Sequence, residues 1–130
     1  MSAPSSEVLE WSNLADQDLG LAMLAVRHGQ FAGLACYHVQ QTIEKYLKAV
    51  LTAAGQSFPL THDLTTLHDL GAAVGLNLPI PQLDLVRITR FGVGIRYPGF
   101  LDPPSLAEAR QAIRTAGRVR RLCRRHLGLA

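Results

Sequence analysis

The sequence predicts an all-α protein, a four- to five-helix up-and-down bundle, from three observations. Apolar residues recur at steps of three and four along most of the chain, which is the period of an amphipathic helix. Glycines and prolines separate these stretches, where they end one helix and allow the next to begin. No stretch shows a convincing alternation of apolar and polar residues of the kind that marks a half-buried strand.

Two long helices are predicted at the beginning of the chain. The first covers about residues 6–28 and ends at Gly29. The second covers about residues 31–54 and ends at Gly55, because glycine tolerates the left-handed dihedral angles that commonly follow a helix. The apolar content of the first helix comes from Leu9, Leu14, Leu19, Leu21, Leu24 and Val26.

Two shorter helices are predicted next. The third begins at Thr61 or Asp63, since either side chain can accept a hydrogen bond from the first turn, and it ends at Gly75. Pro79 and Pro81 bracket the beginning of the fourth, because proline is favoured in the first turn of a helix. An irregular stretch rich in glycine and proline follows.

The last helix is predicted over residues 105–127. Ser105 and Glu108 have the spacing of a capping box, in which each side chain bonds the backbone of the other residue. Arg120 falls on or near the apolar side of this helix, so its side chain either snorkels at a rim or reaches a carboxylate or a ligand. The predicted buried seam consists of Leu106, Ala109, Ile113, Ala116, Cys123 and Leu127.

The composition fits one soluble cytoplasmic domain over residues 1–130, with residues 1–5 expected to be disordered. No apolar run approaches the roughly 20 residues of a membrane-spanning helix, and the beginning of the chain does not resemble a secretory signal. Cys36 and Cys123 lie in apolar helical patterns without a companion pair, which favours buried, reduced thiols. We therefore expect neither a disulfide scaffold nor a membrane partner.

Polar residues form a stripe along the second predicted helix. Gln41, Glu44, Lys45 and Lys48 recur at helical steps, beside the apolar face of the same helix. Glu44 and Lys48 are four residues apart in the favourable order, so a simple ion pair explains them. The stripe is also what a helix needs to hold a specific polar ligand or neighbour.

Basic residues are concentrated in the last predicted helix. Arg110, Arg114, Arg118, Arg121 and Arg125 step by three or four residues and build one continuous ridge. Such a ridge suits a phosphate backbone or an acidic partner. An ordinary solvated surface, whose charge complements the helix dipole, explains it equally well.

Common enzyme motifs and metal-ligand spacings do not occur. We find no glycine-rich phosphate loop, no nucleophile elbow and no acids paired on one helical face. The histidines show no metal-ligand spacing, so we expect no metal and no cofactor.

Several of these pieces, in this order, resemble the HEPN domain family, the higher eukaryote and prokaryote nucleotide-binding domain. The resemblance covers nearly the whole chain and is closest to small, stand-alone bacterial and archaeal members. The matching pieces are Tyr37, Gln40, Gln41, Glu44, Lys45, Leu47, Lys48 and Ala49, then Gly55, then Thr61-His62-Asp63-Leu64, then Arg96-Tyr97-Pro98.

The resemblance implies a helical bundle that forms a homodimer, binds a nucleotide or RNA, and pairs with a separately encoded minimal nucleotidyltransferase of the toxin–antitoxin type. It also implies that His62 faces the polar stripe. The ligand-binding residues implied in this way are Gln41, Glu44, Lys45, Lys48, His62, Arg96 and Tyr97.

Some HEPN proteins are metal-independent ribonucleases, with an Arg and a His separated by four to six residues. Here Arg96 is followed by no histidine in that range. Arg120 or Arg121 with His126 has the spacing but lies at the end of an arginine-rich helix. Two functions follow: a binding module that lacks the usual ribonuclease motif or, alternatively, an endoribonuclease toxin that uses Arg96 or His126.

Overall fold

A computed structural model describes residues 3–93, 98 and 102–130 and contains five helices in that part of the chain. No strand occurs among these residues, so the predicted all-α bundle is confirmed. None of the described helices has the length and apolar character needed to cross a membrane. The helices are α1 (Ser6–Arg27), α2 (Ala32–Ala53), α3 (Leu64–Ala73), α4 (Gln82–Phe91) and α5 (Leu106–Leu127).

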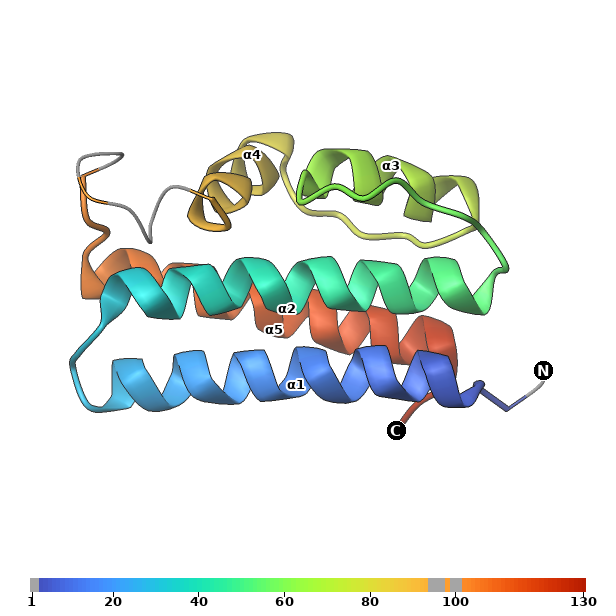
Figure 1. Cartoon of the computed structure of the whole chain (residues 1–130), viewed down its shortest axis with the longest axis horizontal. Coiled ribbons are helices and arrows are strands. Elements are labelled where there is room, and N and C mark those ends of the chain that lie inside the picture. The colour runs from blue at the N-terminus through green and yellow to red at the C-terminus, as the bar shows by residue number, and fades with distance from the viewer. Residues whose placement is uncertain (1–2, 94–97, 99–101) are drawn as a thin grey trace.

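Helix α2 is the centre of the bundle and contacts all four other helices. In Figure 1 it runs through the middle of the molecule, with α1 on one side and the two short helices α3 and α4 on the other. Helix α5 lies along both α1 and α2. Three long helices therefore form the body of the bundle, and two short ones together fill a fourth position.

Local hydrogen bonds explain where the helices begin. The Ser105 hydroxyl accepts from Glu108 N at 3.0 Å while Ser105 N donates to the Glu108 carboxylate at 3.2 Å, so the predicted capping box is present. Asp63, one of the two predicted caps, accepts from Thr65 N at 3.0 Å and begins α3. The beginning of α2 has no such signal, because its N-cap is Phe31 with a left-handed φ of 57° and no side-chain cap.

The core is built mainly from α2, whose apolar side is completely buried. Cys36 and Cys123 are free thiols inside it, and burial raises the pKa of each to about 12. Four of the six residues of the predicted α5 seam are buried, and Leu106 and Ile113 are half-buried. The largest fully buried apolar side chains of α2 are Val39, Ile43, Tyr46, Leu47, Val50 and Leu51.

Helix α1 buries a different side from the one its leucines suggest. Only Leu19 of its leucines is buried, and the buried side of α1 also includes the small residues Ser12, Ala15 and Ala22. Alanines allow two helix backbones to approach closely. As a consequence α1 carries several exposed leucines on its outer surface: Leu9, Leu14, Leu21 and Leu24.

Candidate functional site

The middle of the predicted polar stripe is a buried carboxylate. Glu44 is 4% exposed, and one of its oxygens accepts from Lys48 Nζ at 3.0 Å. The other oxygen lies 2.7 Å from Nδ1 of His62 and 3.1 Å from the Gln40 amide nitrogen. The i, i+4 pair expected from the sequence is therefore present, and the structure brings His62 to it.

The ammonium group of Lys48 is enclosed as well as paired. Lys48 is 7% exposed, and its Nζ lies 5.6 Å from the centre of the Trp11 ring and 5.8 Å from that of Phe58. Aromatic faces attract a cation at such distances, more strongly where water is excluded. Lys48 thus balances Glu44 from inside the bundle, where it is poorly placed to receive a ligand.

The environment of Glu44 keeps it ionised. Burial by itself would raise the pKa of the carboxyl group. The hydrogen bonds from His62, Gln40 and Lys48, together with the Lys48 charge, outweigh burial and lower the pKa of Glu44 below its ordinary value. A carboxylate in this position accepts hydrogen bonds and orients its donors.

Gln40 connects this cluster to the segment that precedes α3. Its amide nitrogen donates to the His62 carbonyl at 3.0 Å, and its oxygen accepts from Gln41 at 2.7 Å. Gly92, at the end of α4, lies so close that a Cβ atom there would be 2.6 Å from Gln40 Cδ. Gln40 was not among the predicted site residues, although its position one turn before Glu44 and two turns before Lys48 is a signal in the sequence.

Lys45 belongs to a second cluster on another side of α2. Its Nζ donates to Asp18 of α1 at 2.5 Å, and Nδ1 of His38 lies 2.8 Å from the other oxygen of the same carboxylate. The predicted stripe is therefore divided between two carboxylates. Asp18 could not be found from the stripe, because it lies 27 residues away on a different helix.

His62 is the member of the Glu44 cluster that reaches the surface, with its side chain 62% exposed. Since the ionised Glu44 carboxylate can only accept, we assign the proton shared with it to Nδ1 of His62. In this tautomer Nε2 of His62 is an acceptor, and none of the described residues hydrogen-bonds to it. This arrangement can bind a donor or exchange a proton with one.

Two further predicted site residues, Arg96 and Tyr97, lie outside the described residues. Arg120 Nε donates to Asp16 at 2.8 Å, so this arginine reaches a carboxylate, one of the alternatives left open by the sequence. The hydroxyl of the buried Tyr46 also donates to Asp16, and burial is the main reason that the pKa of Tyr46 rises to about 12.

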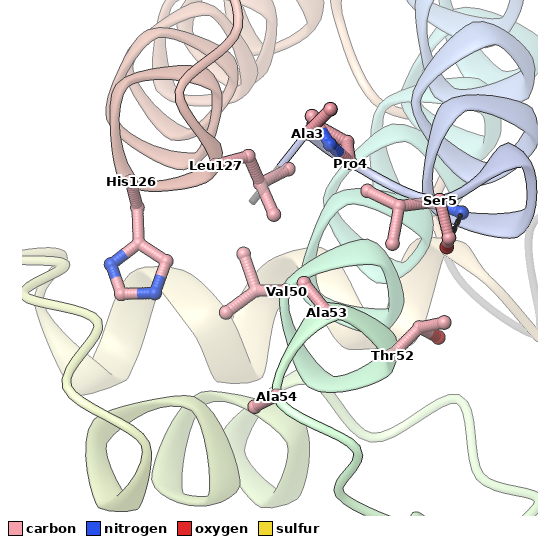
Figure 2. Close-up of a pocket in the computed structure, with 10 residues that line it drawn as sticks. Ala3, Pro4, Ser5, Val50, Thr52, Ala53, Ala54, His126 and Leu127 are labelled. Atoms are coloured by element: carbon pink, nitrogen blue, oxygen red, sulfur yellow. Dashed lines mark hydrogen bonds between the residues drawn. The ribbon is translucent and has the colours of Figure 1, made fainter. Parts of the chain in front are cut away.

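His126 lies at a cavity near the C-terminal end of α5, of about 470 Å³. Figure 2 shows His126 and Leu127 across from the end of α2, with the segment before α1 beside them. In Figure 1 this end of α5 lies beside the beginning of α1, whereas α4 and the beginning of α5 lie toward the opposite end. The lining is mostly apolar and small: Ala3, Pro4, Ser5, Val8, Val50, Thr52, Ala53, Ala54, His126 and Leu127.

The described residues contain no group of three or more His, Cys, Asp or Glu side chains arranged to hold a metal ion. The side chains of the Glu44 cluster offer hydrogen bonding, charge and proton exchange through His62.

Comparisons with known proteins agree with this architecture. The crystal structure of TT1696 from Thermus thermophilus superposes with a TM-score of 0.75 at 22% sequence identity, over 93% of this chain and 98% of that one. At this identity the similarity establishes the fold. No functionally curated protein matches in sequence.

The HEPN domain family model matches residues 8–126, a range that includes all five helices except the first two residues of α1 and the last residue of α5. The match spans both carboxylate clusters and the segment that carries His62. The chain therefore belongs to the HEPN domain family.

Proposed function

We propose that this HEPN protein is a dimeric module that binds a nucleotide or RNA and pairs with a minimal nucleotidyltransferase of the toxin–antitoxin type, without catalysing a reaction itself. One observation carries the proposal. Each charged side chain of the polar stripe, Glu44, Lys45 and Lys48, has an ionic partner within the chain. These charged groups are paired inside the bundle, so they are not free to act on a substrate, and the Glu44 carboxylate positions His62.

The proposed ligand site is the exposed edge of His62 with Arg96 and Tyr97. Gly92 packs on Gln40, and Gln40 bonds the His62 backbone, so the end of α4 adjoins the segment before α3. Arg96 follows Gly92 by four residues, a distance of at most about 14 Å of extended chain. An arginine within that reach suits a phosphate, and a tyrosine beside it suits stacking on a base.

Nucleotide binding tests this site. We expect a fluorescent ATP to bind the wild type and to bind His62→Ala or Arg96→Ala about tenfold more weakly, a difference of about 1.4 kcal/mol. His126→Ala is the matched control, because it removes an exposed histidine at a cavity that His62 does not line. Equal affinity of all four proteins would refute the proposed site.

The dimer is proposed through the outer side of α1. HEPN domains commonly dimerise. Three leucines lie exposed on one side of α1: Leu14, Leu21 and Leu24, at 45%, 50% and 48%. An exposed apolar row of this kind is uncommon on the surface of a monomeric protein. We expect light scattering to give about twice the 14.2 kDa chain mass and Leu21→Glu to give a monomer. A wild-type protein with the mass of a single chain would contradict the dimer.

The alternative is a metal-independent endoribonuclease, which one observation favours: a histidine held by an ionised carboxylate is a suitable general acid–base. His62 Nε2 would accept the proton of a ribose 2′-hydroxyl as its oxygen attacks the adjacent phosphorus. The bond from phosphorus to the 5′-oxygen would break, the 5′-oxygen would receive the proton that His62 had accepted, and a 2′,3′-cyclic phosphate would remain. Cleavage of total RNA in excess EDTA, lost in His62→Ala and kept in His126→Ala, would establish this alternative.

A further inference from the structure

The basic ridge of α5 is fully formed on the surface. Each of its five arginines is exposed, namely Arg110, Arg114, Arg118, Arg121 and Arg125. At about 100° per residue they fall within an arc of about 80°, opposite the buried seam of the helix. Arg110 and Arg125 are fifteen residue steps apart, so at about 1.5 Å per step the ridge is about 22 Å long.

No arginine of the ridge forms an ion pair within the described residues. Arg114 instead donates a hydrogen bond to the neutral side-chain amide of Gln111, at 2.6 Å. The acidic residue of α5, Glu108, lies in its first turn and serves the capping box. The positive charge of the ridge is therefore not neutralised by the described part of the protein.

The C-terminal half of the ridge borders a cavity of about 540 Å³. Gly117 contributes to its wall, and a Cβ atom on Gly117 would meet no atom within 4 Å. A glycine inside a helix lowers stability by about 1 kcal/mol relative to alanine, so the glycine that keeps this space open is unfavourable for the helix. The lining residues are Gly117, Arg120, Arg121, Arg124, Arg125, Leu129 and Ala130.

The chemistry of this surface fits a nucleic-acid strand. Guanidinium groups bind phosphates through two parallel hydrogen bonds and remain charged at any physiological pH. Protein interfaces have an apolar centre, whereas α5 contributes no large exposed apolar residue among those described. A ridge of about 22 Å matches about six nucleotides of a stacked strand at about 3.4 Å each.

We propose that the α5 ridge binds the phosphate backbone of a single-stranded nucleic acid, with the cavity at Gly117 receiving one nucleotide of the strand. The cavity is lined by α5 and the two residues at the end of the chain, and no hydrogen bond or ion pair among the described residues joins a ridge arginine to His62. The ridge proposal rests on the part of the proposed function in which the protein binds RNA, and it is tested separately from His62.

The test is the salt dependence of binding to a labelled 20-nucleotide RNA and to a DNA of the same sequence. We expect the triple variant Arg118→Glu/Arg121→Glu/Arg125→Glu to bind at least tenfold more weakly. Its slope of log affinity against log salt should fall by about 2, because each phosphate bound by an arginine contributes about 0.7 to the slope. Arg27→Glu, an exposed arginine at the end of α1, is the matched control and should change affinity less than twofold.

A second pair of variants tests the cavity. Gly117→Leu should fill the cavity and weaken binding of both the RNA and the DNA, while Gly117→Ala should not weaken either. Replacing the three ridge arginines by glutamine keeps the test interpretable if the glutamate variant fails to fold. Unchanged affinity and slope in the folded ridge variants, or an equal loss in Arg27→Glu, would overturn the proposal.

His62→Ala separates the two sites. Loss of RNA binding in the ridge variant but not in His62→Ala supports the ridge and leaves the nucleotide site to its own test. Loss in His62→Ala with a normal ridge variant refutes the ridge alone. If the wild type prefers RNA to DNA, RNA is the strand that the ridge binds. If the wild type binds neither strand, the proposed binding of nucleic acid to the ridge is refuted.

Discussion

The polar stripe of α2 and the basic ridge of α5 are both rows of charged residues at helical spacing, yet the tertiary structure treats them in opposite ways. Glu44 and Lys48 are buried and satisfied by each other, by His62 and by Gln40. The ridge arginines are exposed, and none of them forms an ion pair with a carboxylate among the described residues. We call the Glu44–Lys48 row the closed row, because its charges are paired inside the bundle and organise the fold. We call the arginine ridge the open row, because its charges are available to a binding partner.

The largest expected effect comes from breaking the closed row. Glu44→Ala leaves the Lys48 ammonium buried without its carboxylate, which should lower the free energy of unfolding by about 3–5 kcal/mol. Urea unfolding followed by circular dichroism measures the loss. Arg118→Ala on the open row is the control and should change stability by no more than about 0.5 kcal/mol. A Glu44→Ala variant that loses less than about 1 kcal/mol would show that the row is not a closed unit.

Acid should open the closed row. The pKa of Glu44 is lower in the folded protein than its ordinary value of 4.5, so the folded state binds fewer protons there than the unfolded state. The resulting stabilisation is complete above about pH 4.5 and is lost as the pH falls through the lowered folded value. The stability difference between the wild type and Glu44→Gln should therefore shrink as the pH falls below about 4.5. A difference that stays constant as the solution is acidified would exclude the contribution of Glu44 ionisation.

Two glycines make the smallest and sharpest comparison. Gly92→Ala places a Cβ atom against Gln40, which must give up hydrogen bonds to Glu44 and His62, at a cost of about 1–2 kcal/mol. Gly117→Ala meets open space in the middle of α5 and should stabilise the protein by about 0.5–1 kcal/mol. Thermal unfolding of the two variants measures both signs. A Gly92→Ala variant at least as stable as the wild type would mean that the packing at Gly92 does not matter, and a destabilised Gly117→Ala would contradict the open space at Gly117.

Helix boundaries were largely predictable because their causes are local. The predicted range 6–28 corresponds to Ser6–Arg27, and 105–127 corresponds to Leu106–Leu127. Caps and glycine stops act within a few residues of the chain, so the sequence contains them directly. The left-handed Phe31 was missed, because aromatic residues rarely adopt that conformation and no local motif announces it.

The candidate site was predictable only in part. The Glu44–Lys48 pair follows from i, i+4 spacing, and the family resemblance suggested that His62 faces it. The pairing of Lys45 with Asp18 was not predictable, because the choice between two carboxylates depends on how α1 packs against α2. The outward leucines of α1 have the same origin, since the packing of α1 in the bundle buries Ala15 and Ala22 and leaves these leucines exposed.

The sequence by itself determined the helices, their caps and the positions at which charges recur on each helix. These features depend on dihedral preferences and on the 3.6-residue period, which operate within one helix. The tertiary structure alone decided which charges are buried with partners and which remain open to solvent. That decision depends on groups such as Asp18 and His62, which are distant in sequence and approach α2 only when the bundle forms.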